Sequence, residues 1–337
     1  MLAAMIGCSE KIGSAPGQGI RKRGQFTAAI TANRVLCAEH YILTLRVKDF
    51  PGSEPGQFVQ VLCPPSDATC DSSGHSQFEN RDITWEPGTL PPRFHAPYLL
   101  GSEPYLRRPF SIAGRRDASS SGGSEIDLIY RVVGKATGRM EALKIGEELS
   151  ILGPLGNAFP IDPDMRMALL VGGGVGIPPM IYLAEKLYHS GIPAVAFIGA
   201  QRADLIPLEI TGAVGTGPSG NVREFARYNT PAIVATNDGS LGNKGFVTEA
   251  LEAYGQQISP EGGVVFCCGP TPMMRATAQV GARLNLRCYA SLEQPMACGM
   301  GTCQSCVIKY RPAGAAEWVY KLTCTDGPVF NTTEILW

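Results

Sequence analysis

The stretch MALLVGGGVGIPPM, residues 167–180, combines the signals of a strand, a tight turn and a helix start. Its apolar run up to Val171 favours a buried strand, and the glycines that follow let the backbone approach a ligand closely. The two prolines suit the first turn of a helix, whose unpaired N–H groups can receive a pyrophosphate. The pattern G-x-G-x-x-G is incomplete because Ile177 stands at its third glycine. The turn alone therefore leaves nucleotide binding and tight packing both open.

Strand and helix signals alternate after this turn. Apolar runs at 194–200, 231–236 and 263–268 read as buried strands, and 245–255 and 271–285 read as helices. This alternation predicts an α/β domain over 161–290, with a parallel sheet covered on both faces. The segment CCGPTPMM, residues 267–274, falls at the carboxyl end of a strand, where such sheets bind ligands. A buried cysteine pair before a proline-capped helix is the alternative. Taken together, the two turns favour a nucleotide crevice.

The chain before this domain has a different texture. Short apolar runs at 41–47, 56–63, 125–133 and 146–156 are separated by glycine and proline, which favours an antiparallel barrel or sandwich over residues 25–160. Residues 64–104, rich in proline, glycine, serine and charge, interrupt it as a predicted long inserted loop. Residues 1–24 are predicted to be a disordered leader.

Two arginines precede a proline in LRRPFSIAG, residues 106–114. Arginine offers a planar, permanently charged group for phosphates and flat rings, and Ser111 is a small donor that can reach a ring atom. A solvated basic turn explains the same residues, so this segment alone does not decide between the two.

Composition limits the classes of function. The 337 residues include 29 basic and 30 acidic side chains, which gives no electrostatic reason to expect nucleic acid or a membrane surface as partner. No apolar run reaches the roughly 20 residues of a membrane-spanning helix. The 11 cysteines do not suggest a secreted disulfide framework, which is typical of small domains. The four histidines form no Ser/His/Asp or H-E-x-x-H pattern, so we expect no acid–base catalytic residue. These features predict a soluble cytoplasmic protein.

The cysteines at 298, 303 and 306 are the strongest chemical signal. Their spacing, C-x4-C-x2-C, with Cys324 following after seventeen intervening residues, is that of plant-type 2Fe-2S ligation. Gly299 and Gly301 provide the permissive backbone that a loop around a cluster needs. Zinc, the alternative metal, usually takes two short C-x2-C pairs, and this chain has one. A redox disulfide is disfavoured by the distant fourth cysteine.

In this order, the motifs resemble the ferredoxin reductase superfamily, and more narrowly the electron-transfer subunits of dihydroorotate dehydrogenase B. The C-terminal cysteine cluster closed by Cys324 and DGPVF discriminates most within the superfamily. The resemblance implies an antiparallel β-barrel FAD domain, a parallel-sheet NAD domain, and a small 2Fe-2S domain over 291–337. Outside the insertion, it extends over about residues 25–333 and rests on LRRPFSIAG, IYRVVGKATGRMEAL, LGPLGNAF, ATNDGSLGNKGFVT, CGPTPMM, EQPMACGMGTCQSCVIK and YKLTCTDGPVF.

The resemblance also implies site residues. The flavin ring would lie against Arg108, Pro109, Phe110 and Ser111, and the rest of FAD against Ile129, Tyr130, Arg131, Gly134, Thr137 and Gly138. The nicotinamide nucleotide would take Gly173, Gly174, Gly176, Pro178, Cys268, Gly269 and Pro270. The cluster ligands would be Cys298, Cys303, Cys306 and Cys324.

The implied activity is electron transfer in pyrimidine biosynthesis. A separate FMN-containing catalytic subunit would oxidise dihydroorotate, and electrons would pass through 2Fe-2S and FAD to NAD⁺, with two of each subunit in a heterotetramer. This chain should not act on dihydroorotate alone, because it has no room for a catalytic barrel of about 250 residues. The alternatives are a hydrogenase-linked or ferredoxin:NAD(P) oxidoreductase subunit of the same architecture, and a zinc-stabilised nucleotide-binding module without redox activity. Arg202 leaves NADH and NADPH both open, since it can bind a 2′-phosphate or be solvated.

Overall fold

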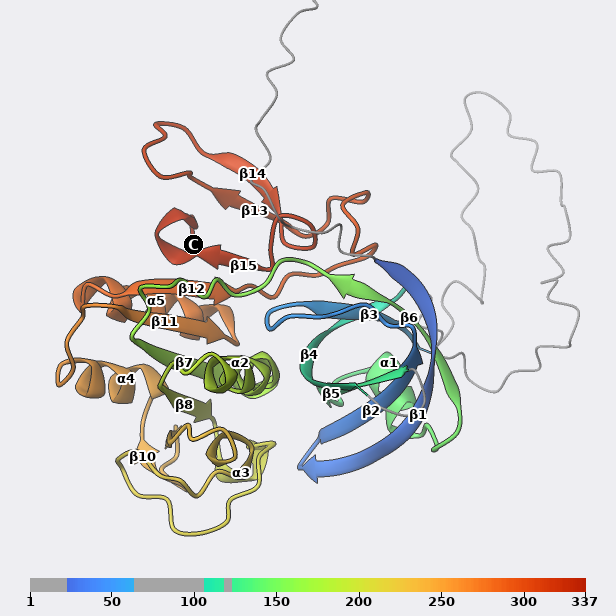
Figure 1. Cartoon of the computed structure of the whole chain (residues 1–337), viewed down its shortest axis with the longest axis horizontal. Coiled ribbons are helices and arrows are strands. Elements are labelled where there is room, and N and C mark those ends of the chain that lie inside the picture. Colours follow the sequence, from blue (N-terminus) through green and yellow to red (C-terminus); the bar gives the residue numbers. More distant parts are fainter. Residues whose placement is uncertain (1–22, 64–105, 118–122) are drawn as a thin grey trace, which may run out of the picture.

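A computed structural model of the chain describes residues 23–63, 106–117 and 123–337. Most of the predicted leader and all of the predicted insertion at 64–104 lie outside these residues. The described residues form a β-barrel, a seven-stranded sheet and a C-terminal hairpin (Figure 1). The predicted fold class is confirmed. The predicted domain boundaries stay predictions.

The barrel is closed and antiparallel throughout. Its strand order is β1-β2-β5-β4-β3-β6. The inward residues include Leu43, Leu45, Val59 and Leu128, all at 0% exposure, and they fill the barrel with a continuous apolar core. The elements are β1 (Gly24–Cys37), β2 (His40–Lys48), β3 (Phe58–Leu62), β4 (Arg108–Asp117), β5 (Gly123–Arg131), α1 (Lys135–Glu141) and β6 (Glu148–Leu155).

The seven-stranded sheet has the order β10-β9-β8-β7-β11-β12-β15, and all its pairs are parallel except β12 with β15. Helix α2 covers one face, and helices α4 and α5 cover the other (Figure 1). The elements are β7 (Met167–Gly173), η1 (Gly174–Gly176), α2 (Ile177–His189), β8 (Ala194–Ala200), η2 (Ala203–Leu205), α3 (Arg223–Ala226), β9 (Ala232–Thr236), β10 (Asn243–Lys244), α4 (Val247–Gly255), β11 (Gly263–Cys268), α5 (Thr271–Arg283) and β12 (Arg287–Ser291).

The C-terminal segment leaves the sheet and returns to it. After β12 the chain forms a loop, the hairpin of β13 (Val307–Tyr310) and β14 (Val319–Leu322), and then β15 (Val329–Asn331) and η3 (Thr332–Glu334). Ser291 pairs with Val329, so the chain comes back to the point where it left. We call residues 292–306 the cysteine loop.

The barrel and the sheet share one apolar core. Ala113 and Ile129 of the barrel belong to the same buried cluster as the inner face of α2. Tyr182 of α2 donates a hydrogen bond of 2.6 Å to the carbonyl of Ser53, and both residues are buried. This contact fixes the crevice between the two units.

The turn after β7 touches the turn after β11 at Gly176. A Cβ atom there would lie 2.2 Å from the carbonyl oxygen of Cys268 and 2.4 Å from the backbone nitrogen of Gly269. An added methyl group must therefore push two backbones apart.

We expect Gly176→Ala to lower the free energy of unfolding by about 1–3 kcal/mol, as overpacking does. Urea denaturation of the cofactor-free chain measures it. Gly220→Ala is the matched control, because nothing lies within 4 Å of the added Cβ, and it should change stability by less than about 0.5 kcal/mol. Equal effects of the two substitutions would contradict the close approach.

Candidate functional site

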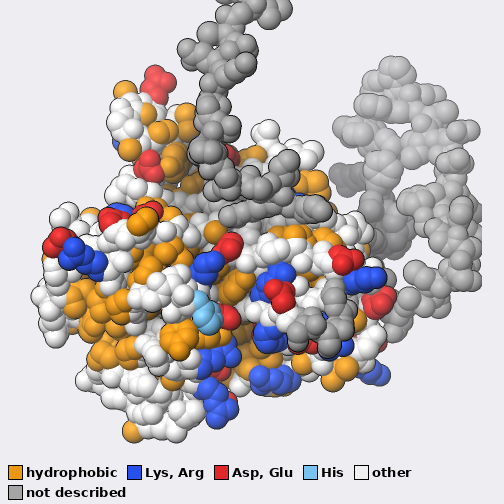
Figure 2. Space-filling view, in the orientation of Figure 1, with side chains coloured by type: hydrophobic (Ala, Val, Ile, Leu, Met, Phe, Trp, Pro, Cys, Tyr) orange, Lys and Arg blue, Asp and Glu red, His pale blue; other side chains and the backbone are white. Residues whose placement is uncertain are grey.

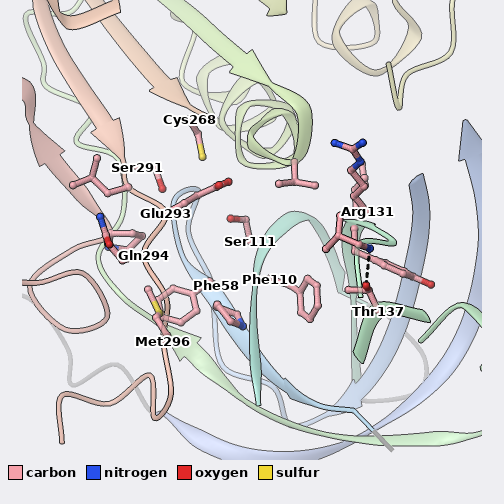
Figure 3. Close-up of a pocket in the computed structure, with 17 residues that line it drawn as sticks. Phe58, Phe110, Ser111, Arg131, Thr137, Cys268, Ser291, Glu293, Gln294 and Met296 are labelled. Carbon is pink, nitrogen blue, oxygen red and sulfur yellow. Dashed lines mark hydrogen bonds between the residues drawn. The ribbon is translucent and has the colours of Figure 1, made fainter. Parts of the chain in front are cut away.

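A cavity of about 390 Å³ lies where the barrel, the sheet and the cysteine loop meet (Figure 3). The barrel contributes side chains of β3, β4, β5 and α1. The sheet contributes Val175 from η1 and Cys268 from the end of β11. The end of β12 and the chain after it close the third side with Ser291, Leu292, Glu293, Gln294 and Met296. The site is therefore an open, mostly apolar crevice with few polar groups, as cofactor sites commonly are.

Most of the predicted FAD residues line this cavity. They are Pro109, Phe110, Ser111, Ile129, Tyr130, Arg131 and Thr137. Arg108, Gly134 and Gly138 do not line it. Strands β4 and β5 thus form one wall of the cavity. The cysteine loop, which is far from both strands in sequence, forms the wall opposite them.

Tyr130 is held rigidly in that wall. It is 1% exposed, packs edge-on against Phe110 at 6.2 Å between ring centroids, and stacks on Tyr41 at 5.6 Å. Its hydroxyl donates a hydrogen bond of 3.1 Å to Asn33 Oδ1. Burial raises the pKa of Tyr130 well above its ordinary value. The phenol is therefore neutral at physiological pH and acts as a fixed aromatic surface.

Thr137 fixes the start of α1. Its Oγ1 accepts a hydrogen bond of 3.0 Å from the backbone N–H of Val133 (Figure 3). It accepts another, of 3.3 Å, from the N–H of Gly134. Arg131 borders the same part of the cavity and pairs with Glu39 at 2.7 Å on the surface. One cation and one hydroxyl thus stand at this end of the crevice.

The two arginines of LRRPFSIAG have different roles. Arg107 donates to the carbonyl and the hydroxyl of Ser150 at 2.8 and 2.9 Å, and so ties the start of β4 to β6. Arg108 donates to the carbonyl of Leu106 at 2.8 Å and is only partly buried. Arg107 is therefore structural, and Arg108 is the arginine that is not committed to another strand.

The two predicted nucleotide turns lie side by side. A Cβ on Gly269 would come within 3.0 Å of the carbonyl oxygen of Gly173. Of the residues predicted for the nicotinamide nucleotide, Cys268 lines the cavity, whereas Gly173, Gly174, Gly176, Pro178, Gly269 and Pro270 lie outside its lining. Burial, with the nearby Glu293, raises the pKa of the Cys268 thiol. A neutral thiol at this position offers surface and polarisability rather than a nucleophile.

Sequence reasoning missed the third wall of the cavity. Glu293 extends from the start of the cysteine loop toward Ser111 (Figure 3). Water reaches its carboxyl through the cavity, while the surrounding protein partly desolvates it and raises its pKa. The signal that could have found it is its place directly after the strand that ends at Ser291, at the carboxyl edge of the sheet.

The cysteine loop already turns its backbone donors toward sulfur. The N–H groups of Met300 and Cys303 both donate to Cys298 Sγ at 3.4 Å. Gly299 and Gly301 have φ values of +72° and +88°, which only glycine adopts without strain. Hydrogen bonds from the Ser305 hydroxyl and from backbone amides lower the pKa of the exposed Cys303 to about 6. The lowered pKa favours the thiolate, the form that binds metal.

Cys306 and Cys324 form a second, buried pair beneath the loop. Each is 1% exposed and packs against Phe58 and Leu155 of the barrel. Burial and the adjacent Cys306 raise the pKa of Cys324 to about 11. Thr323 donates to the Cys306 carbonyl through both its N–H and its hydroxyl, each at 3.1 Å. The base of the hairpin thus fixes the two buried cysteines.

The side chains present suit a 2Fe-2S cluster chemically, although the four thiols do not converge on one point. Within the described residues, no three His, Cys, Asp or Glu side chains form a group that could hold a metal ion as they stand. All four candidate ligands are free thiols: Cys298 is partly buried, Cys303 is exposed, and Cys306 and Cys324 are buried. Amide donors to sulfur and the two positive-φ glycines are what a cluster-binding loop requires.

Arg202 is engaged by a carboxylate. Its Nε and Nη2 each lie 3.0 Å from an oxygen of Asp204. This bidentate hydrogen bonding lowers the pKa of Asp204. A 2′-phosphate at Arg202 would meet that negative charge.

Comparison with known proteins agrees with this arrangement. Residues 293–336 match the family described as the iron–sulfur cluster binding domain of dihydroorotate dehydrogenase B. The chain is 37% identical over 244 residues to the electron transfer subunit of dihydroorotate dehydrogenase B (NAD(+)) from Geobacillus sp. strain WCH70, covering 72% of this chain and 84% of that one. The subunit of the same name from Bacillus cereus strain 03BB102 is 35% identical over 255 residues, covering 74% and 87%.

Solved structures share the fold. An NADH-dependent reduced ferredoxin-NADP oxidoreductase superposes with a TM-score of 0.64 at 23% identity, covering 96% of this chain and 92% of that one. A cytochrome P450 reductase from Amycolatopsis gives a TM-score of 0.55 at 20% identity, covering 80% and 69%. No helix in the described residues is both long and apolar enough to cross a membrane.

The raised pKa of Glu293 predicts that this carboxyl lowers the stability of the fold in a pH-dependent way. Between the unfolded and folded pKa values, the folded state holds more protons at this carboxyl, so its contribution makes stability fall as pH rises. We expect Glu293→Gln, in the cofactor-free chain, to be more stable than the wild type at neutral pH, and the gap to close as pH falls below about 4. Urea denaturation across pH measures it. The exposed Glu317→Gln is the control, and coinciding profiles for Glu293→Gln and wild type would refute the shift.

Proposed function

Since the chain belongs to the family of dihydroorotate dehydrogenase B electron-transfer subunits, we propose that it carries electrons from a dihydroorotate-oxidising catalytic subunit to NAD⁺ in pyrimidine biosynthesis. The observation that carries the proposal is the cavity wall shared by the barrel, the sheet turns and the cysteine loop. In this arrangement a flavin site, a nucleotide turn and the candidate cluster ligands adjoin one another.

The residues of each wall support one cofactor. FAD would be held by Arg108, Pro109, Phe110, Ser111, Ile129, Tyr130, Arg131, Gly134, Thr137 and Gly138 of the barrel. The nicotinamide nucleotide would be held by Gly173, Gly174, Gly176, Pro178, Cys268, Gly269 and Pro270. Cys298, Cys303, Cys306 and Cys324 would ligate the cluster. When bound, FAD supplies two-electron chemistry with NAD(H) and 2Fe-2S supplies one-electron transfer.

We infer that the chain's own residues orient the cofactors and screen them from charge, and do not exchange protons with them. Tyr130 and Cys268 are neutral and buried, so neither presents a charge to the reacting ring. The pairing of Arg202 with Asp204 disfavours a 2′-phosphate and supports NADH over NADPH. We place the protein in the cytoplasm, where thiols such as the cluster ligands stay reduced.

We expect Cys303→Ser to reduce electron delivery to the catalytic subunit by more than about tenfold, because one cluster ligand is lost. NADH-dependent dye reduction should persist, because the cavity does not include Cys303. Dihydroorotate-dependent NAD⁺ reduction by the reassembled complex measures the first rate. Cys37→Ser, a partly buried cysteine of the barrel, is the control.

The wild-type chain tests the proposal itself. After reconstitution it should show a flavin spectrum, iron and acid-labile sulfide in equal amounts, and NADH-dependent dye reduction. A chain that lacks all three is not an electron-transfer subunit. Zinc at one per chain, without iron or sulfide, would establish the zinc-stabilised module. Co-purification with a hydrogenase or ferredoxin partner would favour the related reductases.

Apolar side chains on the hairpin support a docking surface for the catalytic subunit. Trp318 and Tyr320 are 40% and 62% exposed, and Val307 lies exposed on the same face of the hairpin. Hydrophobic atoms gather on this projecting hairpin at the top of Figure 2. The hairpin starts directly after Cys306, so this surface is continuous with the candidate cluster site. Exposed aromatic residues of this kind anchor protein interfaces.

We propose that the complex is a heterotetramer with two of each subunit.

We expect the double substitution Trp318→Ala and Tyr320→Ala to weaken binding of the catalytic subunit by at least about tenfold, since each aromatic anchor contributes more than about 1 kcal/mol. Calorimetric titration of the two subunits measures it, and NADH-dependent dye reduction should not change. Val35→Ala with Ile145→Ala removes exposed apolar side chains from the barrel instead. If both double variants bind alike, the hairpin is not the docking surface.

A further inference from the structure

Gln60 is a polar residue of β3 whose burial the barrel alone does not explain. Its neighbours Val59 and Val61 point into the barrel core, so Gln60 points outward, as strand alternation requires. Even so, it is 0% exposed. Phe58, on the same outer face of β3, packs against Cys306 and Cys324. The C-terminal segment therefore covers this side of the strand and buries the glutamine.

Both polar atoms of the Gln60 side chain lack a partner. Within the described residues, the buried side-chain atoms without a hydrogen bond are Gln60 Nε2, Gln60 Oε1 and His40 Nε2. A buried amide without partners opposes folding, so a native structure that keeps one usually has a use for it. The other buried glutamine nearby, Gln57, is satisfied, because it donates to the carbonyl of Gly156 at 2.9 Å and accepts from the backbone N–H of Glu54 at 2.9 Å.

The unpartnered amide lies against the cysteine loop. A Cβ atom on Gly299 would come 2.5 Å from Gln60 Nε2, so the amide rests directly on the backbone between Cys298 and Cys303. From within the loop, the N–H groups of Met300 and Cys303 point at Cys298 Sγ. Gln60 thus brings a further N–H donor to the loop backbone between Cys298 and Cys303, and it comes from the barrel instead of the loop.

The contact between the barrel and the C-terminal segment is fixed. Asn157, just beyond β6, donates through Nδ2 to the carbonyls of Asp326 and Val329 at 3.2 and 2.8 Å. Its Oδ1 accepts from the N–H of Val329 at 2.9 Å. The barrel, whose strand β3 carries Gln60, and the segment that follows the cysteine loop are therefore held together by hydrogen bonds.

We propose that Gln60 donates a hydrogen bond from Nε2 to a sulfur atom of the 2Fe-2S cluster bound by this loop, and so acts as a positioning residue that sets the cluster's reduction potential. The inference rests on the proposed cysteine ligands. A donor to a cluster sulfur stabilises the more negative, reduced state, so it raises the potential.

The test is Gln60→Leu in the reconstituted chain. Removal of one hydrogen bond should shift the equilibrium between oxidised and reduced cluster about fivefold toward the oxidised form, which lowers the potential by about 40 mV at 59 mV per tenfold. A redox titration followed by electron paramagnetic resonance of the reduced cluster measures it, and the g values should also change. Gln60→Glu, which keeps the shape but removes the donor and adds charge, should lower the potential further.

Gln57→Leu is the matched control. It removes a satisfied buried amide three residues away, so it should destabilise the cofactor-free chain and leave the potential unchanged. Gln60→Leu should do the reverse, because the cofactor-free chain loses only an unpartnered group. If Gln60→Leu and Gln60→Met both lose iron while their cofactor-free chains unfold like wild type, contact with the cluster is also supported. An unchanged potential and unchanged g values in Gln60→Leu would overturn the proposal.

The two proposals fail in different ways. Wild-type protein without iron and labile sulfide would reject the ligand assignment and the electron-transfer function together. Wild-type protein with a cluster, but with a potential indifferent to Gln60, would reject only the role of this residue.

Discussion

The antiparallel pairing of β15 with β12 is the constraint on which the site depends. Parallel strands present their carboxyl ends to one edge, and β12 delivers Ser291 to that edge. Because Val329 pairs with Ser291, the residues between them must leave and return at one place. Residues at both ends of this segment line the cavity, with 291–294 and Met296 at its start and Pro328 at its end. The cysteine loop is therefore held over the barrel by backbone hydrogen bonds, and Asn157 adds the bonds from the barrel side.

The chemistry of the cavity follows from how little charge it contains. The thiol of Cys268 and the phenol of Tyr130 stay neutral because burial penalises their charged forms. Glu293 is the titratable carboxyl that enters the cavity, and its raised pKa reflects the same penalty. Such a site is suited to holding flat rings in a fixed relation. That is what transfer of electrons between bound cofactors requires from a protein.

Local patterns made the fold and the metal chemistry predictable. Cysteine spacing and the glycine turn at 172–176 are short-range signals, and the alternation of apolar runs specified both the barrel and the parallel sheet. What sequence could not show was which distant segment covers which surface. Arg107 and Arg108 are adjacent and chemically alike, yet only contact with Ser150 makes Arg107 structural. Gln60 reads as an exposed position of an alternating strand, because the loop that buries it begins more than 200 residues later in the sequence. Glu293 follows a strand end without any motif of its own.

Strand β3 connects the two proposed redox sites through two neighbouring outward positions. Phe58 lines the cavity and also touches Cys306 and Cys324, while Gln60 lies against Gly299. Residues two apart on a strand are separated by about 7 Å. The spacing between the barrel wall of the cavity and the cysteine loop is therefore set by one strand of a closed barrel. The rate of electron transfer falls steeply with distance. Two cofactors whose spacing is fixed by the same strand can therefore exchange electrons without a domain movement. The shared core between α2 and the barrel extends this rigidity to the nucleotide turns.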